Sequence, residues 1–254
     1  MDLAGPWDRL AAVLPELVQS AEQTYAWAEA RDWLGLALRA ASLSGADGLG
    51  LRLWAWVELG DLEITLGRTE AAEAAFKAGL SAAVSLVAAG PNDLDRRRDL
   101  SVSHDRIGDV KIDQGDLPGA LAAFAAGMDI ARSLAEADPG NAGWRRDLSI
   151  SHERIGNVKV AQGDLPGALA AFTAGMDIRK SLAEADPGNA GWRRDIVVSH
   201  TKLARVKSDL GDEAAAMTEM RAALAVLDGM VTDHMHLDPG AARLREQLLT
   251  LFNG

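Results

Sequence analysis

A segment of 48 residues occurs twice in succession, and this duplication constrains the fold more than any other feature of the chain. Residues 99–146 and residues 147–194 differ at only eight positions. A looser copy begins at Asp195, and a more divergent one begins at Leu51. Self-similarity at a fixed period of this length is typical of stacked supersecondary units, none of which can bury its apolar face alone. The duplication therefore favours an extended recognition surface over a pocket enzyme.

The composition predicts an all-α fold. Hydrophobic residues make up 48% of the 254 residues, and aromatic residues only 5%. Ala, Leu, Glu and Arg are strong helix formers, and no Val/Ile/Thr-rich alternating run competes with them.

Each unit reads as a pair of antiparallel helices. In the third unit Asn141 is a candidate N-cap, a Gly-Asp turn ends the first helix near Gly163, and Asp164 can cap the second helix. Pro166 is tolerated in the first turn of that second helix. Apolar residues recur at helical spacing along both helices: Trp144, Leu148, Ile155, Val158, Leu169, Phe172, Met176 and Leu182, with His152 on the first stripe.

The same pattern extends along the chain. Helix pairs are predicted at 51–66 with 69–88, 94–114 with 117–136, 142–162 with 165–185, and 190–210 with 213–231. Two or three further helices are expected within 7–44. We divide the chain into an N-terminal helical cap or degenerate repeat (1–50), four repeats (51–98, 99–146, 147–194 and 195–237) and a C-terminal capping helix (238–254).

Seven positions recur in every unit and carry a family resemblance. In the first unit they are Trp56, Leu59, Gly60, Gly67, Ala72, Phe76 and Gly79. The following units have His104, Ile107, Gly108, Gly115, Ala120, Phe124 and Gly127; then His152, Ile155, Gly156, Gly163, Ala168, Phe172 and Gly175; then the weaker His200, Leu203, Ala204, Gly211, Ala216, Met220 and Ala223. The small residues allow close helix crossing. In these positions the chain resembles the tetratricopeptide repeat family.

This resemblance implies a right-handed superhelical solenoid of antiparallel helix pairs with helical caps at both ends. It also implies a non-catalytic protein-binding scaffold or adaptor. The usual unit of the family has about 34 residues, whereas this one has 48. It is similar to the long-repeat variety of bacterial multidomain and signalling proteins, so a signalling or multiprotein assembly is the expected setting.

Charge and cysteine content exclude several classes. The net charge of −11 argues against a nucleic-acid or anionic-membrane surface, because both need clustered positive charge. There is no cysteine, so no disulfide or thiolate metal site is expected. The start of the chain lacks a positively charged leader, and the longest uncharged apolar stretch, 78–90, is shorter than the roughly 20 residues of a spanning helix. We expect a cytoplasmic protein.

Five of the eight differences between the near-identical copies form one stripe on the first helix. They are Val102/Ile150, Asp105/Glu153, Asp109/Asn157, Ile112/Val160 and Asp113/Ala161. The family resemblance implies that this stripe lines the concave wall. Two of the changes alter charge and favour tuned recognition, but drift of exposed positions after a recent duplication explains the pattern equally well. The other three differences, Ala125/Thr173, Ala131/Arg179 and Arg132/Lys180, fall on the second helix.

Extended by one turn, the stripe reaches a row of arginines at one rim. The predicted groove comprises Arg98, Val102, Asp105, Asp109, Asp113, Arg146, Ile150, Glu153, Asn157, Val160, Arg194 and Arg205, with Trp54, Val57, Asp61 and Ile112 beside them. Its mixed character predicts a protein or peptide partner with basic and apolar side chains. Alternatively, these charges pair with one another and form an ordinary solvated face. The carboxylate-clamp pattern of chaperone-binding relatives is not met, because acidic residues stand where that clamp has Lys and Asn.

Catalysis, metal and cofactor binding are not expected. His104, His152 and His200 each follow a serine, but neighbours on a helix point in different directions, so packed histidines are favoured over catalytic ones. Asp233, His234, His236 and Asp238 form the only dense set of possible metal ligands, without a supporting motif. The alternative function is a self-associating structural module that uses the N-terminal aromatic residues Trp7, Tyr25, Trp27 and Trp33 or the outer faces of the helices.

Overall fold

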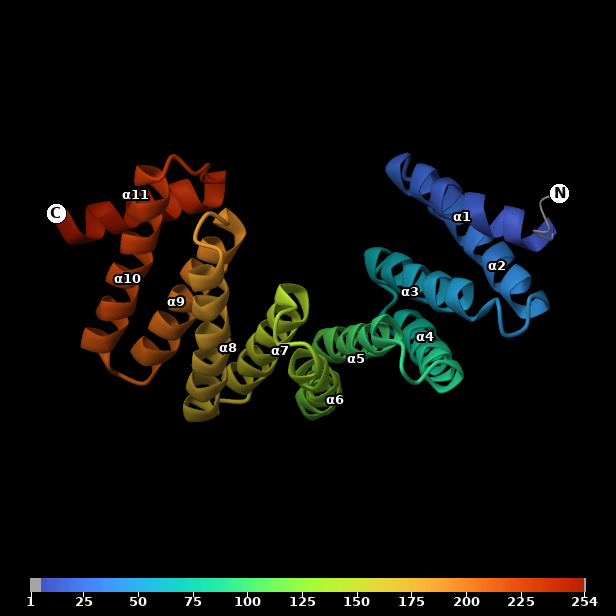
Figure 1. The fold of residues 1–254 in the computed structure, drawn as a ribbon, viewed down its shortest axis with the longest axis horizontal. Helices are drawn as coiled ribbons and strands as arrows, with labels where there is room; N and C mark the ends of the chain where they lie inside the picture. Colours follow the sequence, from blue (N-terminus) through green and yellow to red (C-terminus); the bar gives the residue numbers. More distant parts are fainter. Residues whose placement is uncertain (1–5, 254) are drawn as a thin grey trace. The chain divides into compact units, whose positions relative to one another are not determined.

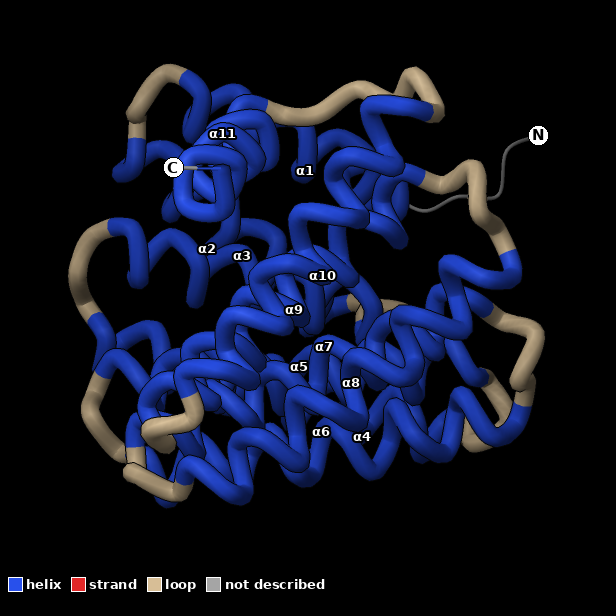
Figure 2. The backbone as a smooth tube through the Cα atoms, turned by 90° about the vertical axis from the view of Figure 1, so that its left-hand side faces the viewer, coloured by secondary structure: helices blue, strands red, loops and turns tan. Residues whose placement is uncertain are grey.

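A computed structural model describes the backbone of residues 6–253 and the side chains of residues 12–252. Throughout this part of the chain the regular elements are α-helices, and no strand occurs (Figure 1, Figure 2). The helices are α1 (Pro6–Gln23), α2 (Trp27–Leu43), α3 (Leu49–Thr65), α4 (Thr69–Ala89), α5 (Leu94–Asp113), α6 (Leu117–Ala137), α7 (Ala142–Ala161), α8 (Leu165–Ala185), α9 (Ala190–Asp209), α10 (Glu213–Thr232) and α11 (Pro239–Asn253). The predicted all-α class is confirmed.

Helices that follow one another in sequence pack against one another. The contacts run α1–α2, α2–α3, α3–α4 and α4–α5 in the first part of the chain, and α7–α8, α8–α9, α9–α10 and α10–α11 in the second. These contacts divide the chain into two compact units, Met1–Ile130 (unit 1) and Ala131–Gly254 (unit 2). The boundary falls inside α6 and therefore inside the second predicted repeat. The repeat boundaries themselves stay a prediction.

The helix ends lie close to those predicted from sequence, because the capping and turn residues that define them are local. The predicted pair 142–162 and 165–185 is observed as α7 and α8, and residues 7–44 hold two helices. Asn141 caps α7 by accepting a hydrogen bond from the Trp144 N–H at 3.1 Å, and Asp164 caps α8 by accepting from the Gly167 N–H at 2.9 Å. Both caps were predicted.

A glycine with positive φ closes the turn inside each of the four helix pairs. Gly67, Gly115, Gly163 and Gly211 have φ values of 70°, 75°, 78° and 82°. At the third of these turns the N–H of Asp164 donates to the carbonyl oxygen of Lys159 at 2.9 Å, which is the bond that ends a helix in a left-handed residue. The recurring glycine of these turns is therefore required by the backbone.

A second set of glycines lets an aromatic ring pack against the first helix. A Cβ on Gly156 would lie only 2.5 Å from an edge carbon of the Phe172 ring. Gly60 with Phe76 and Gly108 with Phe124 repeat this close approach. In the fourth pair the aromatic residue is absent. There Ala204, which is buried, replaces the glycine, and Met220 replaces the phenylalanine.

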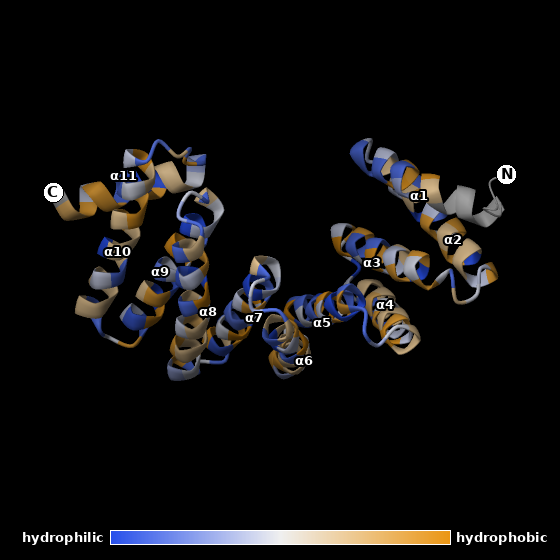
Figure 3. Ribbon diagram, viewed as in Figure 1, coloured by the Kyte–Doolittle hydropathy of each residue, from blue (hydrophilic) through white to orange (hydrophobic). Residues whose placement is uncertain are grey.

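One helix in the described part of the chain, α4, is long and apolar enough to span a membrane by length and composition alone. Such a helix is weak evidence for a membrane, because buried core helices pass the same test. Ala72, Phe76 and Ala83 of α4 are buried, and the helix packs between α3 and α5. Figure 3 shows α4 mostly in apolar colours and α5 with more polar ones. This packing buries 33% of the apolar window of α4.

The aromatic residues near the N-terminus mostly pack into unit 1. Trp27 and Trp33 lie against the core cluster that contains Leu14 and Leu34. Tyr25 is 78% exposed, has a positive φ of 57° and contacts the edge of Trp27. The side chain of Trp7 lies outside the described residues. Tyr25 is thus the exposed aromatic residue among those described here, and self-association through this segment stays a prediction.

Candidate protein-binding surface

The predicted groove residues lie on the first helices of three successive pairs. Arg98, Val102, Asp105, Asp109 and Asp113 belong to α5, Arg146, Ile150, Glu153, Asn157 and Val160 to α7, and Arg194 and Arg205 to α9. Helix α5 lies in unit 1, and α7 and α9 lie in unit 2, so each unit is described by itself.

In unit 1 acidic side chains from α1, α3 and α5 come close together. Asp61 of α3 pairs with Arg106 of α5 at 3.0 Å. Burial raises the pKa of Asp61, and Asp109 raises it further, against the opposing effect of Arg106. The pKa of Glu58 is raised by burial and then by Glu22 and Asp61. Repulsion from Glu22 and Asp61 thus adds to burial at Glu58, whereas at Asp61 the effect of Arg106 exceeds that of Asp109.

A cavity of about 310 Å³ lies between α1 and α3 beside this acidic cluster. Its lining combines apolar side chains of α1 with the indole of Trp54 and the carboxyl groups of Glu22 and Glu58. Burial, followed by the charge of Asp61, raises the pKa of Glu22. Trp54, which was predicted to border the groove, thus lines an acidic and partly apolar hollow, and Asp61 belongs to the acidic cluster beside it. Glu22 and Glu58 were not among the predicted groove residues.

Other predicted residues of α5 differ in their environment. Val102 is 43% exposed and Asp113 is exposed, as a recognition surface requires. Asp105 lies against α6, where a Cβ on Gly127 would be 3.2 Å from its Oδ1 atom. Asp105 is therefore partly packed between two helices, and its replacement would also disturb their contact.

In unit 2 the predicted row of arginines is engaged in ion pairs. The Nε atom of Arg146 lies 2.8 Å from Asp195, and its Nη2 atom donates to the other carboxylate oxygen at 3.3 Å. The guanidinium also lies 5.5 Å from the ring centre of Trp192. Asp195 raises the pKa of Arg146. Arg194 repeats the arrangement with Asp238 at 3.2 Å.

The acidic and amide residues of α7 are paired as well. Lys202 of α9 lies 3.2 Å from Glu153 and donates to Asn157 at 2.9 Å. Ile150 and Val160 are half-buried. Arg205 of α9 is 77% exposed and lies 4.0 Å from Asp209. The pairing of charges, which was the alternative to a charged binding groove, thus describes most of the unit 2 wall.

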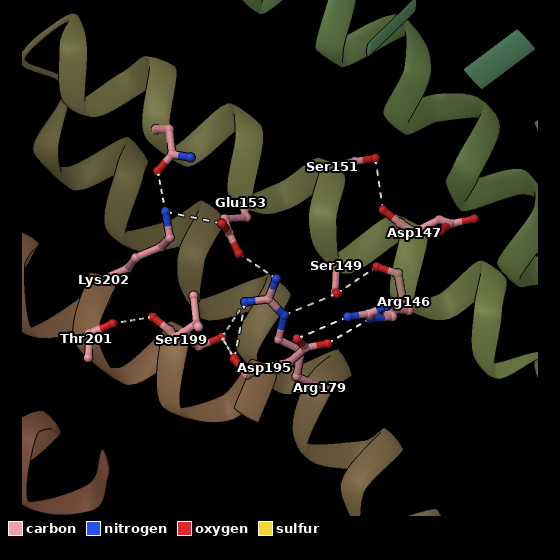
Figure 4. Close-up of polar contacts among 12 residues, drawn as sticks. Arg146, Asp147, Ser149, Ser151, Glu153, Arg179, Asp195, Ser199, Thr201 and Lys202 are labelled. Atoms are coloured by element: carbon pink, nitrogen blue, oxygen red, sulfur yellow. Dashed lines mark hydrogen bonds and ion pairs between the residues drawn. The ribbon is translucent and has the colours of Figure 1, made fainter. Parts of the chain in front are cut away.

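A buried arginine organises this wall, and the sequence reading did not identify its role (Figure 4). Arg179 of α8 is 5% exposed. Its guanidinium donates to Glu153 of α7 at 2.5 Å, to the Ser149 hydroxyl at 3.3 Å and to the Ser199 hydroxyl of α9 at 2.7 Å. Burial by itself would raise the pKa of Glu153, but Arg179 and Lys202 outweigh it and lower the pKa. The available signal was that Ala131/Arg179 and Asp105/Glu153 change together between the copies.

The side chains of the Ser-His pairs make contacts within and between helices. Ser199 is buried, and its hydroxyl donates to the Asp195 carbonyl oxygen at 3.0 Å while accepting from Arg179. His200 lies 2.6 Å from Glu219, which also contacts Lys207 at 2.5 Å. Burial lowers the pKa of His104 and of His152.

The four possible metal ligands before α11 have other contacts. Asp233 accepts from Arg193 at 2.5 Å, and Asp238 accepts from the N–H groups of Gly240 and Ala241 at the start of α11. Within the residues that the structure describes, no group of three His, Cys, Asp or Glu side chains is placed to hold a metal ion.

Comparisons with known proteins agree with this architecture. A profile of the tetratricopeptide repeat family matches residues 55–83. No curated protein sequence matches the chain. Among solved structures, the apo form of RapI is similar with a TM-score of 0.70 and 11% identity, covering 96% of this chain and 59% of RapI.

Two further structures share the fold over nearly their full length. Nearly identical TPR-like repeats of a kinesin light chain from Podosopora anserina align with a TM-score of 0.62 and 16% identity, covering 89% of this chain and 98% of that one. The MamA protein aligns with a TM-score of 0.56 and 12% identity, covering 91% and 98%. At these identities the likeness establishes the fold.

Proposed function

Because the chain is built from tetratricopeptide-like helix pairs, we propose that it is a non-catalytic scaffold that binds a segment of a partner protein. The first helices of the pairs form the binding wall, and the partner segment is extended or helical, with basic and apolar side chains. The setting is the one expected from sequence, a cytoplasmic signalling or multiprotein assembly.

The observation that carries this proposal is the acidic hollow of unit 1. Glu22, Glu58 and Asp61 each have a raised pKa, with burial as the first cause and neighbouring carboxylates as a further one. A lysine or arginine from a partner would supply the missing positive charge. Its aliphatic stem would pack on Trp54, where a cation near an indole face gains about 0.5–2 kcal/mol.

The paired wall of unit 2 has a different part in this proposal. Its arginines and acids already satisfy one another, so a charged partner group would have to displace an existing contact. Exposed ion pairs such as that of Arg146 with Asp195 contribute little on balance. We therefore propose that unit 1 selects the charge of the partner segment, and that unit 2 contributes shape complementarity and apolar contacts.

The test removes the charge of two carboxyl groups at the hollow by substitutions that keep the size of each side chain. An immobilised peptide library is first screened with the full chain, and a selected peptide is titrated by calorimetry against Glu58→Gln/Asp61→Asn. We expect selected peptides to be basic and apolar. We also expect the double variant to bind about tenfold or more weakly, because charge-assisted hydrogen bonds contribute about 1.5–3 kcal/mol each.

The matched control is Asp177→Asn/Glu184→Gln, which removes one aspartate and one glutamate from exposed positions of α8 in unit 2. It removes the same amount of negative charge but leaves the hollow intact, so its affinity should equal that of the unmodified chain. Equal weakening of peptide binding in both variants would mean that the overall negative charge of the chain, and not the hollow, attracts the peptide. Selection of acidic peptides would refute the proposal.

A further inference from the structure

A cavity of about 370 Å³ lies between α9, α10 and α11 in unit 2. Most of its wall is apolar, and the main contributors are Val197, Val198, Leu227, Met230 and Leu244. Arg194, His236 and Asp238 also line it. Small-molecule sites typically have volumes of about 300–1,000 Å³ and combine apolar walls with a few polar groups.

One repeat earlier, the corresponding position carries a charged side chain. Leu227 stands 48 residues after Arg179, whose guanidinium lies between α7, α8 and α9 and bonds to Ser149 and Ser199. Val197 stands 48 residues after Ser149. In the group formed by α9, α10 and α11, Leu227 therefore replaces the buried arginine. Val197 replaces Ser149, one of the partners of that arginine. The space at this end of unit 2 suits a hydrocarbon.

Arg194 provides a positive charge at this cavity. Its side chain is 60% exposed, and its ion pair with Asp238 uses Nε at 3.2 Å. In the described part of the chain no acceptor takes up its terminal N–H groups. Asp238 is committed to capping α11, and the Ala241 N–H is the first cause of its lowered pKa. The guanidinium can therefore receive a second carboxylate.

We propose that this cavity binds an aliphatic monocarboxylate, with the hydrocarbon chain against Val197, Leu227 and Leu244 and the carboxylate on Arg194. The charge of Arg194 selects an anion over a cation, and the apolar wall selects a long chain over a short one. Each buried methylene strengthens binding roughly fourfold. This site does not include the acidic hollow of unit 1, although Arg194 of α9 also belongs to the predicted groove.

The test titrates the full chain by calorimetry with decanoate, decanol and decyltrimethylammonium. We expect decanoate to bind at one site, decanol to bind about tenfold more weakly and the cation not to bind. Hexanoate should bind far more weakly than decanoate, because it buries fewer methylenes. Arg194→Gln should lower the affinity for decanoate about tenfold and leave that for decanol unchanged.

Two variants separate the site from general effects. Arg146→Gln removes the arginine at the same place one repeat earlier, where Arg179 fills the space, and should not change decanoate binding. Ala241→Phe fills the cavity from α11 and should abolish decanoate binding, while the helical circular dichroism signal is retained. Failure of decanoate to bind, or equal loss in Arg194→Gln and Arg146→Gln, overturns the proposal. Binding of a leucine-terminated peptide in place of decanoate also overturns it, in favour of a docking site for a protein terminus.

Discussion

The eight differences between the two near-identical copies include a coupled pair. Where one copy has Asp105 and Ala131, the other has Glu153 and Arg179. The longer acid and the new arginine meet at 2.5 Å in the interior of unit 2. An arginine introduced here alone would face the shorter side chain of an aspartate, and a poorly paired buried charge is strongly destabilising. At this position, the difference between the copies reflects packing and not the choice of ligand.

Arg179→Ala is expected to lower the free energy of unfolding by about 2–4 kcal/mol, because it removes the buried charge partner of Glu153 and a hydrogen bond to each of two buried serines. Urea unfolding at neutral pH measures the change. The neighbouring exposed residue provides the control, since Lys180→Ala should alter stability by only about 0.5 kcal/mol or less. In a double-mutant cycle, Glu153→Asp should cost less in the Arg179→Ala background than alone. Additive effects would contradict the coupling.

At the scale of helices, the sequence predicted the architecture closely because its signals are local and repeated. Caps such as Asn141, turn glycines such as Gly163 and the apolar stripes each act within one helix pair. The candidate site was less accessible to sequence reading. The partners of Arg146 and Arg179 lie 49 and 26 residues away, so which charges pair depends on how neighbouring helices pack. Glu22 and Glu58 lie outside the duplicated segment altogether.

The turn glycines provide a prediction at this scale. Gly163→Ala should destabilise the chain by about 1–2 kcal/mol, because a Cβ is strained at a φ of 78° even though the space around it is open. Gly188→Ala is the control, since that loop glycine lacks a positive φ. Thermal or urea unfolding of both variants should separate them. Equal stability would mean that the Gly-Asp turn tolerates a side chain.

Across the whole molecule, the two units differ in how their carboxyl groups are held. Among the described side chains, all four carboxyl groups with a raised pKa lie in unit 1: Glu22, Glu58, Asp61 and Asp99. In unit 2 the resolved shifts are downward, at Glu153, Asp164, Glu219 and Asp238. Acidification should therefore protonate the four groups of unit 1 with a raised pKa first. At lower pH it should weaken the ion pairs of unit 2 and those of Glu73 and Asp116 in unit 1.

Glu58→Gln tests the sign of this effect. A carboxyl group with a raised pKa stabilises the fold below its unfolded pKa, and this contribution is lost as the pH rises through the folded pKa. Glutamine imitates the protonated form, so the variant should have a higher urea midpoint at pH 7 and an unchanged one near pH 3.5, below the ordinary glutamate pKa of about 4.3. Glu184→Gln should change neither midpoint. A lower midpoint for Glu58→Gln at pH 7 would show that the charge stabilises unit 1.

The contact between Arg179 and Ser199 has a consequence for how the array can change in length. Tandem segments of nearly identical sequence readily lose or gain a copy when genetic material is exchanged between them. Here the arginine of one copy bonds to a serine of the following copy and to the backbone of Asp195. A shortened array that fused the Arg179 helix to a different successor would have to supply those acceptors again. Ser103 and Ser151 occupy the equivalent position in the other copies, so a change in the number of copies keeps the serine acceptor of the buried arginine.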